Sequence, residues 1–110
     1  MELLVIVLNK TEFLNDMLSV MVEVGITDAT ILDSGGMGHI LAYEVPIFAG
    51  LRQLLGDSRN YNKTVFALIE KGDTFNQLLK LLKEINIDFS QKGTGIAFTT
   101  PIDSFIVSEE

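Results

Sequence analysis

The chain has 110 residues, no cysteine and a formal net charge of −7. A single domain is expected at this length, and the lack of thiols excludes disulfides, thiol catalysis and zinc–thiolate sites. The acidic balance argues against nucleic acid as a partner, because phosphate binding needs clustered Lys and Arg. Hydrophobic residues make up 47% of the chain and the mean hydropathy is +0.34, so apolar surface left over after folding would favour association of subunits.

The first predicted element is a strand at residues 3–8. This continuous aliphatic run is typical of a strand that is covered on both faces or lies centrally in a sheet. The run is too short to span a membrane, and it lacks the basic flank and the cleavage site of a signal peptide. We therefore expect no direct membrane insertion and a cytoplasmic location.

A helix is predicted next, over residues 12–24. Its apolar side chains recur with helical spacing: Phe13, Met17, Met21 and Val24. Gly25 is expected to end the helix, because glycine readily adopts the left-handed conformation common at a helix C-terminus. A short strand is predicted at residues 29–33. This part of the chain therefore forms a β-α-β unit.

Residues 40–63 form the variable segment of the chain and are too apolar for an ordinary solvated loop. Pro46 can begin a helix and Gly56 can end one. Three apolar side chains between them fall on one face: Phe48, Leu51 and Leu55. We expect a short amphipathic helix at residues 46–55 that packs on its own or a neighbouring subunit. A mobile loop and a partner-binding surface are the alternatives.

The second half of the chain repeats the plan of the first. A strand is predicted at residues 64–69, and a helix begins at Thr74, with Gln77 completing a capping box. The apolar face of this helix consists of Phe75, Leu78, Leu79, Leu82 and Ile85. Its exposed face carries Lys80, Lys83 and Glu84. A final strand is predicted at residues 95–100, stopped by Pro101.

An internal duplication relates the two halves. One fixed shift along the sequence places residues 22–26 on residues 83–87 and Lys10 on Lys71. Two tandem β-α-β units predict an α+β, ferredoxin-like β-α-β-β-α-β fold in one domain over residues 1–110. Right-handed crossovers place both helices on one face of an antiparallel sheet. The uncovered face is expected to be buried against further copies of the chain.

Two glycine-rich turns are the candidate binding elements. Gly36 and Gly38 follow the predicted second strand, whereas Gly93 and Gly95 precede the final strand. Glycine permits close backbone approach, so such turns can present backbone N–H groups to an anion or to a flat ring. A simple tight turn without a ligand is the alternative.

Signatures of an enzyme or of a metal protein are missing from the sequence. His39 is the only histidine, no Gly-x-Ser-x-Gly elbow presents a nucleophile, and no Gly-x-x-x-x-Gly-Lys-[Ser/Thr] loop is present. One histidine cannot supply a usual zinc site without several converging carboxylates. We expect neither catalysis nor a metal site, and no particular cofactor is indicated.

Residues 24–39 resemble the PII family of signalling proteins. The first helix of that family ends in a very similar Val-Gly-Ile-Thr, and its second strand ends in Gly-Phe-Gly where this chain has residues 36–38. Residues 95–105 are closer to PII-like receptors of cyclic di-AMP, which end in a similar Val-Pro-Val-Asp-Ala-Phe. The resemblance implies a ferredoxin-like fold and a trimer whose sheets line the centre. It also implies a nucleotide between subunits and a partner-binding loop at residues 40–63.

The resemblance assigns ligand-binding residues position by position. They are Thr30, Gly36, Met37, Gly38, His39, Gly93, Thr94 and Gly95. The chain departs from the PII pattern where phosphates are held, because Ile96 replaces a lysine, and residues 102–107, expected as a last strand, contain Asp103 and no arginine. The remaining candidate anion contacts are Lys10, Arg52, Arg59 and Lys92. The resemblance therefore implies a ligand with less charge than ATP.

Together these features predict a PII-like trimeric regulatory protein. It would bind an adenine nucleotide, a cyclic dinucleotide or another small metabolite between subunits and relay occupancy through residues 40–63 to a protein partner. A ligand-free trimeric scaffold is one alternative. A CutA-like metal-binding protein is another, against which the lack of cysteine and the single histidine count.

Overall fold

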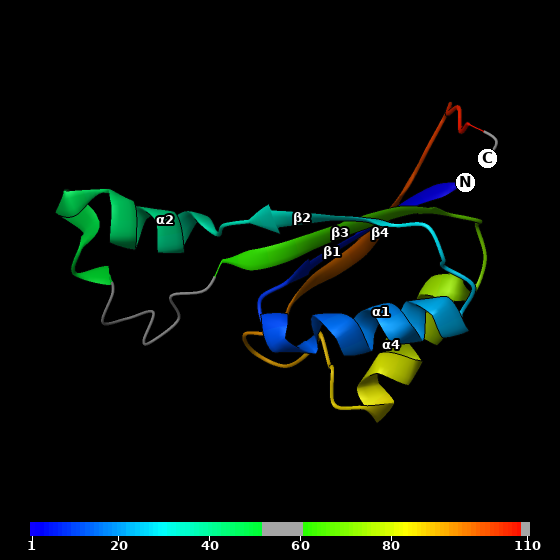
Figure 1. The fold of residues 1–110 in the computed structure, drawn as a ribbon, viewed down its shortest axis with the longest axis horizontal. Helices are drawn as coiled ribbons and strands as arrows, with labels where there is room; N and C mark the ends of the chain where they lie inside the picture. The colour runs from blue at the N-terminus through cyan, green and yellow to red at the C-terminus, as the bar shows by residue number, and fades with distance from the viewer. Residues whose placement is uncertain (52–60, 109–110) are drawn as a thin grey trace.

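A four-stranded antiparallel sheet runs through the structure, with the two longer helices packed on one side of it and a shorter one beyond its end (Figure 1). This computed structural model describes residues 1–51 and 61–108. The strands are β1 (Glu2–Leu8), β2 (Thr30–Ser34), β3 (Asn62–Ile69) and β4 (Gly95–Pro101). The helices are α1 (Leu14–Glu23), α2 (Met37–Glu44) and α4 (Thr74–Glu84), with short 3₁₀ turns η1 (Thr11–Phe13) and η2 (Pro46–Phe48). The predicted α+β class is confirmed.

The strands lie in the order β2-β3-β1-β4, and every neighbouring pair is antiparallel. Strand β1 is therefore central, as its continuous aliphatic run predicts. Leu4 lies opposite Ala67 of β3 on one side and Thr99 of β4 on the other. Strands β2 and β4 form the two edges of the sheet. Within the described residues, no helix is long and apolar enough to cross a membrane.

The hydrophobic core lies between the sheet and the helices α1 and α4, which cover the same face (Figure 1). Alternate residues of β1 and β3 point into it, as the two-residue period of a strand requires. The fully buried large apolar side chains are Leu4, Ile6, Leu8, Met17, Met21, Val65, Leu78, Leu82 and Ile87. The predicted core faces of both helices thus contribute at Met17, Met21, Leu78 and Leu82. Leu79 and Ile85 are the exceptions, because neither packs against the core cluster, and 44% of the Ile85 surface is exposed.

The opposite face of the sheet is covered by no helix in the described part of the chain (Figure 1). The strand register places apolar side chains on it from all four strands: Leu3, Val5, Val7, Leu32, Phe66, Leu68, Ile96 and Phe98. Ile96 and Phe98 on the edge strand β4 are 61% and 44% exposed. We call these eight residues the open face. Large apolar patches on a monomer commonly mark interaction sites, so the open face is a candidate interaction surface.

The internal duplication is visible in how α1 and α4 end. Gly25 has a φ of 90° and Asn86, its equivalent under the shift, has a φ of 68°. The backbone N–H of Ile26 donates to the carbonyl of Met21 at 2.8 Å. The N–H of Gly25 donates to the carbonyl of Val22 at 3.0 Å. The same two bonds end α4: the N–H of Ile87 donates to the carbonyl of Leu82 at 2.9 Å, and that of Asn86 to the carbonyl of Lys83 at 3.0 Å. Both helices therefore end in a Schellman motif.

The predicted capping box of α4 is wrong. Asp73, rather than Thr74, is the N-cap, and Thr74 is the first helical residue. No side chain makes a capping hydrogen bond, and the backbone N–H of Gln77 donates to the carbonyl of Asp73 at 3.0 Å. The Asp73 carboxylate instead accepts a bond from the amide of Asn76. Two adjacent residues of capping type allow the helix to begin one position away from the pattern's prediction.

The segment after β2 also differs from expectation. Residues 37–44 form α2 where the sequence predicts a glycine-rich loop, and Pro46 begins only the turn η2, which ends at Phe48. Residues 52–55 of the helix predicted at residues 46–55 lie outside the described residues. We call residues 36–51 the arm, because they lie beyond the end of β2, away from α1 and α4 (Figure 1).

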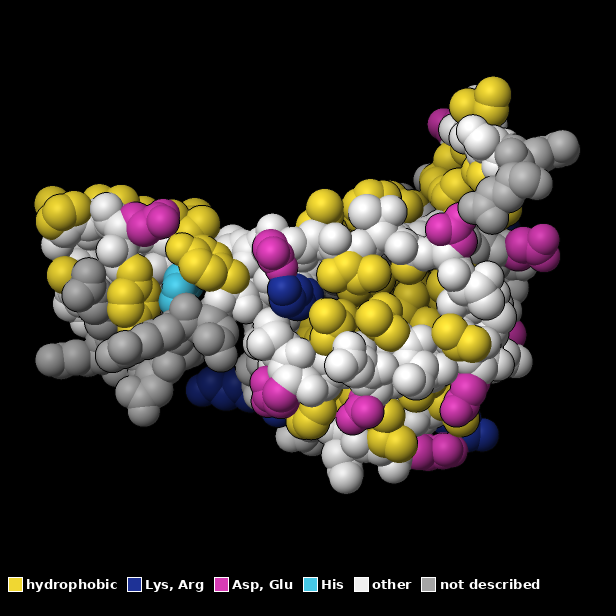
Figure 2. All heavy atoms as spheres, viewed as in Figure 1, with side chains coloured by type: hydrophobic (Ala, Val, Ile, Leu, Met, Phe, Trp, Pro, Cys, Tyr) yellow, Lys and Arg dark blue, Asp and Glu magenta, His cyan; other side chains and the backbone are white. Residues whose placement is uncertain are grey.

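The predicted last strand at residues 102–107 does not form. The chain leaves the sheet after Pro101, and the N–H of Ile102 donates to the carbonyl of Met1 at 3.2 Å. The segment then runs away from the sheet (Figure 1). It carries exposed hydrophobic side chains, and so does the arm (Figure 2). Phe105 and Ile106 are 53% and 97% exposed. An extended segment needs a partner strand to become part of a sheet.

The positive φ of Asn86 gives a test of the helix-end symmetry. We expect Asn86→Gly to raise the free energy of unfolding by about 0.5 kcal/mol, because glycine relieves left-handed strain. Asn86→Ala should lower it by about 1 kcal/mol. Urea unfolding at one fixed protein concentration measures both. A lower stability for Asn86→Gly would contradict the assigned backbone conformation.

Candidate functional site

Both glycine-rich segments lie at the same end of the sheet. Leu8 at the end of β1 pairs with Lys63 near the start of β3 and with Gly95 at the start of β4, and Lys63 pairs in turn with Asp33 near the end of β2. The turn after β2 and the turn before β4 therefore share this end. They lie at opposite edges of the sheet, because β3 and β1 separate β2 from β4.

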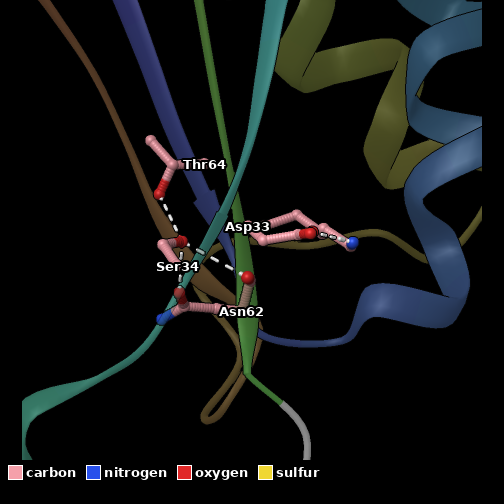
Figure 3. A network of polar contacts seen from close by, with 5 residues as sticks. Asp33, Ser34, Asn62 and Thr64 are labelled. Atoms are coloured by element: carbon pink, nitrogen blue, oxygen red, sulfur yellow. Dashed lines mark hydrogen bonds and ion pairs between the residues drawn. The ribbon is translucent and has the colours of Figure 1, made fainter.

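A polar network joins the ends of β2 and β3 on the open-face side (Figure 3). The Ser34 hydroxyl donates to Asn62, with its oxygen 2.5 Å from Oδ1 and 3.3 Å from the carbonyl oxygen. Since a hydroxyl has one proton, the 2.7 Å contact between Ser34 and the Thr64 hydroxyl is best formed with Thr64 as donor. The Asn62 amide donates to Oδ1 of Asn9 at 3.3 Å. The network thus extends to the residue after β1.

An ion pair lies on the other side of the same strand ends, where Lys63 contacts the Asp33 carboxylate (Figure 3). The Asp33 side chain is 82% exposed, so the pair contributes little to stability. Its consequence for the site is electrostatic. The positive charge of Lys63 is already matched by a carboxylate, which leaves Lys10 and Lys92 as the described candidate contacts for an anion at this end of the sheet.

A groove of about 620 Å³ opens at this end of the sheet. It is lined by Thr11, Asp33, Ser34, Gly35, Tyr61, Asn62 and Lys63. Its walls therefore present hydroxyl groups, an amide, one aromatic ring and one charge-balanced ion pair. Small-molecule sites commonly combine a concave surface with a few polar groups that fix orientation. This chemistry suits a polar ligand with little net charge.

Three aromatic rings pack together where the arm meets the groove: His39, Tyr43 and Tyr61. The ring centroid of His39 lies 4.7 Å from that of Tyr43 and 4.9 Å from that of Tyr61. The Tyr61 hydroxyl donates to Oε1 of Glu44 at 3.4 Å. Gly36 is the N-cap of α2 in ordinary extended conformation, with φ −72° and ψ 148°. A glycine-specific conformation is therefore not needed at Gly36.

The predicted ligand-binding residues fall into three groups, none of which lines the groove. Thr30 is exposed on β2, on the open-face side beside Phe66. The second group begins α2 next to the groove residue Gly35: Gly36, Met37, Gly38 and His39. The third lies at the far sheet edge: Gly93, Thr94 and Gly95. Within one chain the structure does not bring the second and third groups together.

The candidate anion contacts are similarly divided. Lys10 directly precedes Thr11 of the groove, and exposed Lys92 precedes Gly93 at the other sheet edge. Arg52 and Arg59 lie outside the described residues. The two lysines therefore flank different parts of the candidate site.

Thr94 and Gly95 have clear structural roles. Thr94 is 1% exposed, and its carbonyl accepts a bond from the N–H of Asn9 at 2.9 Å. Gly95 has a φ of 143°, and a Cβ added there would lie 1.9 Å from the carbonyl oxygen of Val7. Close packing of β4 against β1 thus requires glycine at this position, whether or not a ligand binds nearby.

The turn that leads into Gly93 is held by Asp88. Its carboxylate accepts bonds from the Ser90 hydroxyl at 2.7 Å and from the Ser90 backbone N–H at 2.9 Å. The hydroxyl bond, followed by the backbone bond, lowers the pKa of Asp88 below its usual value. Gly93 itself has a φ of 84° with open space where a Cβ would project. The turn is therefore built locally.

Sequence reasoning missed the groove residues, most clearly Ser34, Asn62 and Tyr61. A usable signal is present: Ser34 ends a β-branched and aliphatic run, and Asn62 and Lys63 begin another. Polar residues at the ends of two strands are candidates for one shared site. Pairing them, however, requires the β2–β3 register, in which Ser34 lies opposite Asn62.

Comparison with models of protein families and with curated protein sequences gave no match for this chain. Among the described residues, no group of three or more His, Asp or Glu side chains is placed to hold a metal ion.

The distinct roles of the glycines give a graded test. We expect Gly95→Ala to destabilise the protein by about 3 kcal/mol, because a methyl group would strike the backbone of β1. Gly93→Ala should cost about 1 kcal/mol for its left-handed backbone alone. Gly36→Ala is the matched control and should change stability by less than about 0.5 kcal/mol. Equal effects in urea unfolding would contradict the close contact at Gly95.

Proposed function

We propose that this chain is a PII-like homotrimer with a ferredoxin-like fold that binds a small metabolite in a cleft shared by neighbouring subunits. Binding would change the state of the arm and so its contact with a protein partner. A cytoplasmic regulatory role follows from this proposal.

The open face is the observation that carries the proposal. Its apolar side chains extend over all four strands, and Ile96 and Phe98 remain largely exposed in a single chain. Covering such a surface with further copies would remove apolar area from water, which stabilises association by about 25 cal/mol per Å². The sheet order β2-β3-β1-β4 with both long helices on one side is compatible with a ferredoxin-like fold.

The placement of the glycine-rich turns supports a site between subunits. They share one end of the sheet but lie at its opposite edges. A cleft that uses both turns needs a second chain, whose β4 edge would approach the β2 edge and groove of the first. The groove residues Ser34, Asn62 and Tyr61 would then add to the ligand contacts.

A ligand-free trimeric scaffold is the second candidate. It is favoured by Gly95, whose conformation is explained by sheet packing, and by Thr94, whose side chain is buried. On that view the glycines serve only as turns. A CutA-like metal site has no supporting cluster among the described residues.

Assembly can be tested directly by light scattering. The purified protein should have about three times the 12.2 kDa mass of the chain. Phe98→Glu should produce monomers, because it places a charge on the open face. Val22→Glu is the matched control: Val22 is 58% exposed on α1, on the helical side, and its substitution should leave the trimer intact. A stable wild-type monomer would refute the proposal.

Ligand charge gives a second test, by calorimetry. ATP should bind weakly or undetectably, with or without magnesium, because Lys63 is paired with Asp33 and Ile96 stands where the PII family has a lysine. AMP or cyclic di-AMP should bind more tightly, and Ser34→Ala should weaken that binding by about tenfold, since it removes a hydrogen-bonding group from the groove. Tight binding of ATP alone would contradict this charge argument, whereas failure of every ligand would favour the scaffold.

A further inference from the structure

We propose that Tyr61 couples the groove to the arm, so that occupancy of the groove changes the stability of α2. This inference rests on the proposed function for its ligand, but the coupling contacts belong to the ligand-free chain. Tyr61 is the residue immediately before β3, and it lines the groove.

Tyr61 contacts both ends of α2. Its ring packs edge-on against His39 in the first turn, with the centroids 4.9 Å apart. Its hydroxyl donates to Glu44, the last residue of the helix, at 3.4 Å. A displacement of the Tyr61 side chain would therefore change contacts at both ends of α2.

Tyr61 also covers the connection between β2 and α2. A Cβ added to Gly35 would lie 2.6 Å from Cδ1 and 2.9 Å from Cε1 of the Tyr61 ring. Glycine at position 35 thus leaves the space that the ring fills. Gly35 lies between Ser34, the last residue of β2, and Gly36, the N-cap of α2.

Within the described residues, α2 lies beyond the last paired residues of the sheet and depends on its neighbours for stability. The two strands next to the arm pair only as far as Ser34 and Asn62. Met37, at the start of α2, is 78% exposed. An eight-residue helix is too short to be stable alone in water. Its stability must therefore depend on neighbouring contacts, of which those of Tyr61 reach both helix ends.

A ligand can shift the arm only if it binds the two arm states with different affinity. A ligand ring that packs on Tyr61 in its present position would favour the ordered α2. A ligand that displaces the Tyr61 ring would remove the contacts to His39, Glu44 and Gly35 together. In either case Tyr61 transmits the difference, because it lines the groove and contacts the arm at His39 and Glu44.

The ligand-free protein provides the primary test, by hydrogen exchange of the α2 amides. Tyr61→Ala should accelerate their exchange by about tenfold or more, while the amides of β1 and β3 serve as an internal control and keep their rates. Tyr61→Phe, which retains the ring and removes the hydroxyl, should have a smaller effect. Unchanged α2 exchange in Tyr61→Ala would overturn the coupling.

Tyrosine fluorescence gives the ligand-dependent test, because the chain has no tryptophan and only two tyrosines. In Tyr43→Phe the emission comes from Tyr61 alone, and it should change when AMP or cyclic di-AMP binds. The same probe should alter α2 exchange in the wild type. The probe should alter α2 exchange less in Glu44→Ala, a variant that loses the hydrogen bond to Tyr61 although Glu44 does not line the groove.

The outcomes separate the two proposals. A probe that changes α2 exchange equally in wild type and Glu44→Ala, without changing Tyr61 emission, would overturn the coupling while leaving the ligand site in place. If neither probe binds in calorimetry, the ligand part of the proposed function fails. The exchange of the ligand-free variants then decides the coupling independently.

Discussion

The central strand β1 carries large apolar side chains on both faces, yet helices cover only one of them. Leu4, Ile6 and Leu8 are fully buried beneath α1 and α4, whereas Leu3 and Val5 point to the open face and are only half-buried. Burial of the first set holds the sheet and both helices together. The second set leaves apolar area in contact with water, which is unfavourable for an isolated chain. The proposed trimer would bury this second set of side chains.

Much of the fold could be predicted from sequence because its signals are local. The aliphatic run at residues 3–8 identified the central strand, and apolar spacing identified α1 and α4. The duplication correctly paired Gly25 with Asn86, since both adopt the left-handed conformation that ends a helix. Asparagine tolerates that conformation better than most residues do, so the second helix end was recognisable only through the repeat.

The errors arose where local signals compete or where the outcome depends on distant partners. Gly38 reduces the helical propensity of residues 37–44, and the glycines on either side of Met37 suggested a loop, but Gly38 lies within α2. Residues 102–107 have strand-like composition, yet no neighbouring strand pairs with them among the described residues. The polar network at Ser34 depends on the β2–β3 register, which the local pattern of a single sequence does not specify.

The arm leaves the sheet at the point where strand pairing ends, and this has a consequence for how the chain can vary. Its eight-residue helix contributes one fully buried residue, Ala42, and none of the core cluster between the sheet and α1 and α4. Substitutions in the arm therefore leave the core cluster untouched, and under the proposed function they would alter partner recognition with little penalty to folding. The paired ends of β2 and β3 at Ser34 and Asn62 are a fixed attachment point for the arm. Related chains could therefore carry arms of different sequence on the same sheet and helices.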